Sequence, residues 1–146
     1  MLRRLITYKD FDGKEHTELF YFNLTSAEMM ELSVSRDGDL DAYIKRIVKE
    51  DNRPAIIAMV KDFILSSYGV KSEDGKSFIK SEEARTAFAQ SAAYSALFVE
   101  LFTDSTTQTA FVKSIIPPDW DEVRGKLEKA AQTSGGDSPA SLPVET

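Results

Sequence analysis

The sequence contains no cysteine and a single histidine, His16, among its 146 residues. Without cysteine there can be no disulfide, thiolate metal site or thiol nucleophile. Transition metals favour histidine nitrogen and cysteine sulfur, so one histidine speaks against a site of that kind. His16 falls in a predicted strand among charged neighbours. We expect it to be a surface residue and not a catalytic base.

Long apolar runs are also missing. No segment approaches the ~20 apolar residues that a membrane-spanning helix requires. Near the N-terminus, Arg3 and Arg4 precede an apolar stretch too short for a secretory signal, and charged residues follow at once. We therefore expect a soluble protein that stays in the compartment where it is made.

Basic charge is in the minority. Lysine and arginine number 18 against 24 aspartates and glutamates, which gives a formal net charge of −6. Nucleic-acid binding depends on clustered basic surface, so this balance disfavours it. Lys45, Arg46, Lys49 and Arg53 do follow one another around helical turns. A solvated helix face explains that pattern better than a nucleic-acid site.

Motifs that bind phosphate or calcium are incomplete. Gly75, Lys76 and Ser77 resemble the end of a phosphate-binding loop, but Val70 stands where its first glycine is required. The acidic residues 37–41 fail as a calcium loop, because its sixth position is not glycine and its twelfth is not glutamate.

Carboxylates occur in close pairs, but their positions indicate helix capping. Each pair lies in or near a predicted first turn, where negative charge offsets the helix dipole: Glu28 with Glu31, Glu82 with Glu83, and Asp119 with Asp121. We predict no catalytic residue, no metal site and no cofactor, and hence a protein that is not an enzyme.

Hydrophobic residues make up 42% of the chain, enough for the core of one domain. Segments 3–9 and 16–22 alternate as strands, and Asp12-Gly13 between them predicts a hairpin turn. In the second strand, Phe20 and Phe22 share one face and Leu19 and Tyr21 the other. Both faces are apolar, which indicates either burial on both sides or an exposed face that binds a partner.

Beyond the hairpin the apolar period becomes helical. A Thr25–Glu28 capping box opens a helix to about residue 35, and helices at about 40–50 and 54–68 follow, with Gly69 as the expected C′ residue. Residues 70–80 are predicted as a loop. Three further helices are expected at 82–90, from Ser91 to about 102, and up to the prolines at 117–118.

The sequence therefore predicts an α+β fold that is mostly α. An N-terminal antiparallel β-hairpin precedes a bundle of about five to six short helices, and a flexible C-terminal tail follows. Residues 1–118 form a single globular domain in this prediction, with the hairpin at 3–22 and the helices at 25–117. Residues 119–132 form a short helix, and 133–146, rich in glycine, serine and proline, form the tail.

Several segments resemble one protein family. Residues 6–13 and 20–28 look like the opening of the tail assembly chaperones of long-tailed bacteriophages. The likeness continues through residues 67–81 and from Phe88 to Pro117, so that it covers about residues 5–117. The resemblance implies a factor in the bacterial host cytoplasm that binds the phage tape measure protein and helps recruit tail-tube protein. It implies no catalytic residues to carry over and no place in the finished virion.

Two apolar segments are candidate surfaces for a client, namely residues 19–22 and the corner at 115–120. Their candidate binding residues are Leu19, Phe20, Tyr21, Phe22, Ile115, Ile116 and Trp120. The alternative for both segments is that they belong to the core. For the function, the alternatives are a phage tail structural or completion protein and a generic cytoplasmic interaction module.

Overall fold

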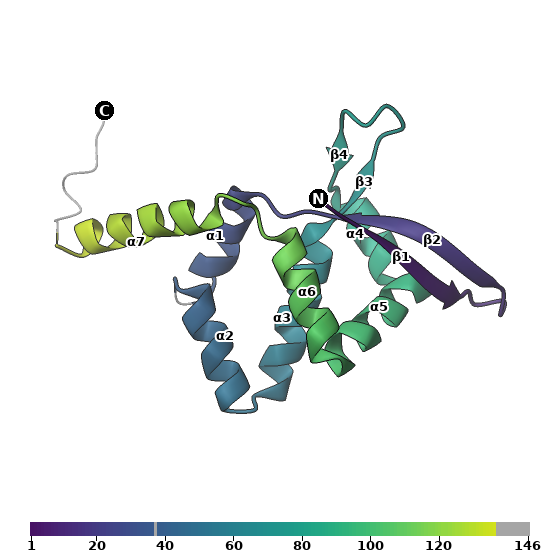
Figure 1. Cartoon of the computed structure of the whole chain (residues 1–146), viewed down its shortest axis with the longest axis horizontal. Coiled ribbons are helices and arrows are strands. Elements are labelled where there is room, and N and C mark those ends of the chain that lie inside the picture. The colour runs from purple at the N-terminus through teal and green to yellow at the C-terminus, as the bar shows by residue number, and fades with distance from the viewer. Residues whose placement is uncertain (37, 137–146) are drawn as a thin grey trace.

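The computed structural model describes residues 1–36 and 38–136, which form an antiparallel sheet of four strands together with seven helices. Figure 1 shows the hairpin of the first two strands at one end of the molecule and the last helix at the other. The elements in chain order are β1 (Leu2–Lys9), β2 (Glu15–Phe22), α1 (Ser26–Val34), α2 (Leu40–Lys49), α3 (Arg53–Ser67), β3 (Tyr68–Lys71), β4 (Phe78–Ile79), α4 (Glu82–Ala89), α5 (Ala92–Thr103), α6 (Ser105–Ile115) and α7 (Trp120–Gly136).

The predicted N-terminal hairpin is confirmed. β1 and β2 pair without interruption from Leu2 opposite Phe22 to Lys9 opposite Glu15. The turn is fixed by the Asp10 carboxylate, which accepts hydrogen bonds from the backbone N–H groups of residues 12 and 14, each at 2.9 Å. Gly13 takes a φ of +83°, a backbone conformation that glycine adopts without steric cost.

The predicted helix starts are also confirmed, because they depend on local capping. The Thr25 side chain accepts from the Glu28 N–H, and the Glu28 carboxylate accepts from the Thr25 N–H at 2.9 Å. Asn52, Ser81 and Ser91 cap α3, α4 and α5, each by a side-chain oxygen that accepts from the backbone N–H three residues later.

The predicted end of α3 near residue 68 is confirmed, since the helix ends at Ser67 and Tyr68 is its C-cap residue. Gly69 follows the C-cap as predicted, but it lacks the positive φ of a typical C′ glycine because the chain turns directly into β3. There Gly69 pairs with Tyr21, and Tyr68 pairs with Phe22. A Cβ at Gly69 would lie 2.6 Å from the Phe78 ring, so glycine serves here as the residue that leaves room for an aromatic side chain.

The loop predicted at 70–80 contains a second hairpin instead. Val70 pairs with Ile79 and Lys71 with Phe78, which adds β4 to the sheet in the order β1-β2-β3-β4. Its turn has Gly75 at a φ of +75° and the Asp74 carboxylate accepting from the Lys76 N–H at 2.9 Å. β4 has only two residues, too few for an alternating pattern to identify it as a strand.

The core joins the hairpin to the helices. The ring of Phe22, fully buried, makes edge contacts with Phe111 of α6 at 5.2 Å and with Phe88 of α4 at 6.0 Å between centroids. Tyr68 stacks on Phe88 at 4.1 Å. Leu97 of α5 is also fully buried, so the inner face of the hairpin, α3, α5 and α6 share one core.

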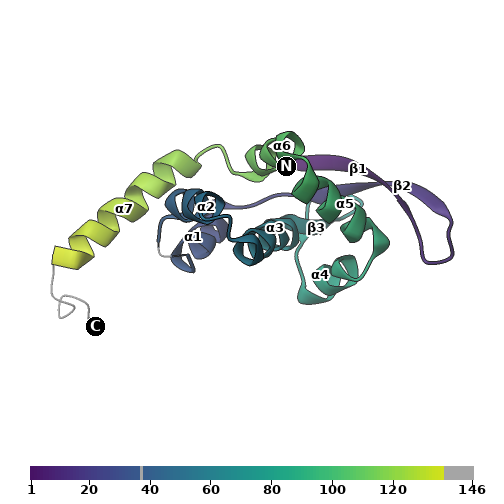
Figure 2. The ribbon, with the colours of Figure 1, turned by 90° about the horizontal axis from the view of Figure 1, so that it is seen from below.

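The last helix, α7, begins inside this core and then leaves it. Trp120 is only 5% exposed, and Arg124 forms an ion pair with Asp41 of α2. Beyond this point α7 runs away from the other helices (Figures 1 and 2). It extends to residue 136, further than the predicted helix at 119–132 and into the predicted tail at 133–146. Residues 137–146 of that tail lie outside the described residues.

Candidate protein-binding surfaces

The structure separates the four candidate residues of β2 by strand alternation. Phe22 is fully buried and Phe20 is half-buried against Phe88, so these two face the core. Leu19 remains 42% exposed on the opposite face, which it shares with the half-buried Tyr21. Only one face of β2 is therefore open to a partner.

On that open face, apolar residues of neighbouring strands adjoin one another. Leu5 of β1 lies directly opposite Leu19 and is 66% exposed. Tyr21 lies two residues further along β2, with the Lys71 ammonium 5.3 Å from its ring centroid. We call Leu5, Leu19 and Tyr21 the outer sheet face.

The backbone of β2 is also open along part of one edge. β3 pairs with β2 only at residues 21 and 22, and the Asn23 N–H then donates to the Ser67 carbonyl at 2.8 Å. Alternate residues of an antiparallel strand direct their N–H and C=O groups to the same neighbour. Thr17 and Leu19 therefore direct theirs to the β3 side, where no described strand pairs with them.

The second predicted surface, the corner at residues 115–120, is largely internal. Ile115 is 1% exposed and Trp120 5%, while Ile116 is half-buried. The reason is a contact with α1 and the segment before it. The Ile115 carbonyl accepts from the Leu24 N–H at 3.1 Å, and the Ser26 hydroxyl donates to the Asp119 carboxylate at 2.8 Å.

A third surface, which lies outside the segments predicted from the sequence, is an apolar groove among α2, α3 and α6. Its volume is about 270 Å³. Residues of α3 form its floor, and residues of α2 and α6 form its two walls. The principal apolar residues that line it are Ile44, Ile47 and Val48 of α2, Ile56, Met59, Val60 and Phe63 of α3, and Phe111 and Val112 of α6. The one-sided apolar stripe of α2 was the signal in the sequence that could have indicated it.

The one charged residue among the described residues that line this groove is basic, although the chain as a whole has a net charge of −6. Lys113 of α6 is exposed and lines the groove. Lys45 and Lys49 of α2 are exposed on either side of Val48 in the sequence. None of these three lysines has an ion-pair partner among residues 1–36 and 38–136.

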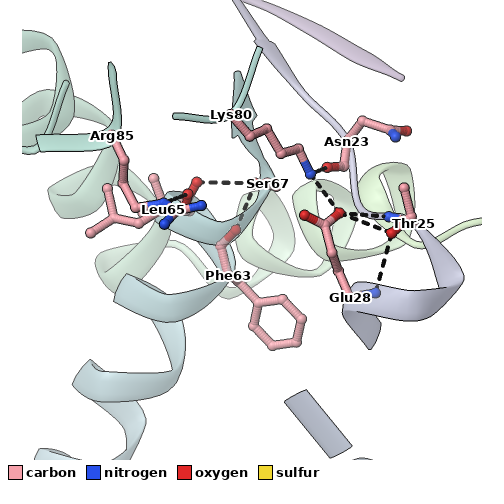
Figure 3. Close-up of polar contacts among 9 residues, drawn as sticks. Asn23, Thr25, Glu28, Phe63, Leu65, Ser67, Lys80 and Arg85 are labelled. Carbon is pink, nitrogen blue, oxygen red and sulfur yellow. Dashed lines mark hydrogen bonds and ion pairs between the residues drawn. The ribbon is translucent and has the colours of Figure 1, made fainter. Parts of the chain in front are cut away.

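A half-buried polar cluster connects the start of α1 to the segment before α4 (Figure 3). The Lys80 ammonium donates to the Glu28 carboxylate at 2.6 Å and to the Asn23 carbonyl. Burial of Glu28 opposes ionisation, but hydrogen bonds from Lys80 and Thr25 outweigh it, so the pKa of Glu28 is lowered. Every charged group drawn in Figure 3 has a hydrogen-bond or ion-pair partner, which indicates a structural role and not a reactive site.

The single histidine likewise takes part in turn structure. His16 Nε2 lies 2.7 Å from the Asp10 carboxylate, and its ring stacks on Tyr8 at 5.3 Å between centroids. The hydrogen bond from His16 and those from the backbone lower the pKa of Asp10. Among residues 1–36 and 38–136, no three or more acidic or histidine side chains are grouped so that they could hold a metal ion.

Further findings bear on the class of protein. In the described part of the chain, no helix has both the length and the apolar character needed to cross a membrane. A protein-family model described as phage tail assembly chaperone matches residues 1–141. No curated protein and no solved structure matches the chain.

Proposed function

The chain belongs to the family of phage tail assembly chaperones, and on this premise we propose that it binds the phage tape measure protein in the host cytoplasm and assists assembly of the tail tube without catalysis. The observation that carries the proposal is the family match over residues 1–141, which includes every strand and helix described above.

The accessible apolar surface supports a role in binding another protein. Leu5 and Leu19, 66% and 42% exposed, adjoin on the outer sheet face. Contiguous exposed apolar side chains on a soluble protein commonly mark a site of protein contact. A net charge of −6 favours solubility of the chaperone with its client, because like charge opposes aggregation.

Co-expression with the tape measure protein of the same phage tests the proposal. We expect the two proteins to co-purify and the tape measure protein to stay in the soluble fraction. Expressed alone, the tape measure protein should precipitate. Absence of co-purification together with unchanged solubility would refute the proposal.

A pair of substitutions tests the outer sheet face as the contact. Leu19→Ser combined with Tyr21→Ser should weaken capture of the tape measure protein about tenfold, as expected for the loss of two moderate contacts. Val99→Ser is the matched control, because Val99 is 56% exposed on α5, away from this face. Equal capture by both variants would exclude the outer sheet face but leave the proposed function standing.

The composition of purified virions distinguishes this function from that of a tail structural or completion protein. A chaperone is expected to be absent from the finished particle, whereas a structural protein is retained. Detection of the chain in purified virions at the level of other tail proteins would contradict the proposal.

A further inference from the structure

We propose that the groove among α2, α3 and α6 binds one amphipathic helix of a partner protein, with acidic residues beside that helix's apolar face. The inference deepens the proposed function, and it rests on that function for the identity of the client as the tape measure protein.

The shape of the groove favours a helix. Ligand pockets typically enclose ~300–1,000 Å³, and this groove, at about 270 Å³, lies just below that range. It therefore has room for a few anchoring side chains and not for a whole ligand. Two helical walls over a helical floor recur where an amphipathic helix inserts residues spaced at i, i+3, i+4 and i+7.

The apolar lining remains accessible at the mouth. Val48, which lines the α2 wall, is 60% exposed. Ile56 and Val112 are half-buried, whereas Met59, Val60 and Phe63 form the buried floor. Covering Val48 would remove its apolar surface from water, which is favourable, and a partner can do this without unfolding the bundle.

The charge around the groove selects the partner. Among the described residues that line the groove, Lys113 on the α6 wall is the only charged one, so an inserted helix meets positive charge on that side. Lys45 and Lys49 add exposed positive charge elsewhere on α2. Exposed ion pairs add little affinity individually, but complementary charge raises association rates and excludes partners of the wrong sign. The acidic residues 50 and 51 follow the end of α2, and Asp51 is already paired with Arg53.

Synthetic peptides test this chemistry without any phage client. Two peptides of about 20 residues, both with leucine at helical spacing, differ only in carrying glutamate or lysine along the flanks. Binding to the full chain is measured by fluorescence anisotropy. We expect the glutamate peptide to bind about tenfold more tightly at low ionic strength, with the preference shrinking as salt is added. Absence of binding, or equal binding of the two peptides, would overturn the inference.

Substitutions on the rim then assign the preference to this groove. Lys49→Glu with Lys113→Glu should abolish or reverse the preference, and Val48→Glu should weaken both peptides. All three side chains are exposed, so folding should be preserved. The matched control, Lys9→Glu with Lys76→Glu, changes the net charge equally at exposed sites on the two hairpins. If this control has the same effect as the rim variant, the groove is not the site.

Other occupants of the groove give different results. A second copy of the chain would appear in sedimentation as a dimer that Val48→Glu dissociates, and that result would overturn the proposal. If residues 137–146 of the same chain fill the groove, their deletion should raise peptide affinity.

Capture of the tape measure protein without peptide binding would reject this inference alone. Peptide binding without capture would reject the proposed function and leave the groove's chemistry intact.

Discussion

Lys80 Nζ lies 2.6 Å from Glu28 Oε1, and this ion pair joins the segment before α4 to the capping box of α1 (Figure 3). Both side chains are largely shielded from water, with exposures of 14% and 26%. Lys80 also donates to the Asn23 carbonyl at the end of β2. One ammonium group thus connects the segment before α4 to the junction of β2 and α1, which lies more than 50 residues earlier in the sequence.

Removal of this ammonium should destabilise the fold. In Lys80→Met the half-buried Glu28 carboxylate and the Asn23 carbonyl lose a donor, and we expect a loss of about 1–3 kcal/mol in the free energy of unfolding. Urea denaturation measures it. Lys76→Met, at an exposed lysine of the β3–β4 turn, should change stability by less than about 0.5 kcal/mol. Equal effects of the two substitutions would show that the Lys80–Glu28 ion pair contributes nothing to the free energy of unfolding.

Acid should weaken the same connection. The pKa of Glu28 is lowered in the folded protein. A lowered folded pKa means stability that is present above the unfolded value of ~4.3 and lost as the pH falls through the folded value. Unfolding free energies measured from pH 7 to pH 3 should therefore fall more steeply for the wild type than for Glu28→Gln. Because Asp10, Asp74 and Asp104 titrate in both proteins, parallel curves would show that Glu28 makes no such contribution.

Gly69 should tolerate a methyl group only when the Phe78 ring is absent. In Gly69→Ala the new Cβ meets the ring at 2.6 Å, so the ring must move and β4 should pair less well with β3. We expect a cost of about 1–3 kcal/mol, typical of overpacking. In a Phe78→Ala background the same substitution should cost almost nothing, and a double-mutant cycle measures the difference. Simple additivity would contradict the proposed clash.

The C-terminal limit of the folded unit should lie after Trp120. Truncation after residue 132 removes residues 137–146 and the end of α7, where the helix runs away from the other helices, and should leave the thermal midpoint nearly unchanged (Figure 2). Trp120→Ala removes a core side chain and should cost about 3–5 kcal/mol. A large loss of stability on truncation would mean that the end of α7 contributes to the fold.

The parts of the fold that the sequence predicted depend on neighbouring residues. Asp12-Gly13 suits a tight turn, and the hairpin formed there with the expected pairing. Thr25 and Glu28 need only each other to form a capping box. Such signals act over three or four residues, so they can be read without knowing what the segment later packs against.

The parts that were missed depend on distant residues. β3 exists because Tyr68 and Gly69 meet β2, and β4 because it pairs with β3. Gly69 after an apolar helix is a typical stop signal, but its role here is set by the ring of Phe78, which no local pattern reveals.

The same distinction between features set by neighbouring residues and features set by distant residues applies to the candidate surfaces. Strand alternation correctly placed Leu19 and Tyr21 on a different face from Phe20 and Phe22, but it did not say which face is covered. The groove was missed because its walls come from α2 and α6, which are far apart in sequence. Apolar stripes predict that helices pack, whereas an opening left between them is a property of the assembled bundle.

The two walls of the groove also emerge from the ribosome at different times. α2 and α3 are complete by residue 67, whereas α6, which supplies the second wall, ends at residue 115. Domains form as synthesis proceeds from the N-terminus, so the apolar side of α2 and α3 has no second wall until nearly 50 further residues have been added. A client helix therefore has its complete binding site only late in translation.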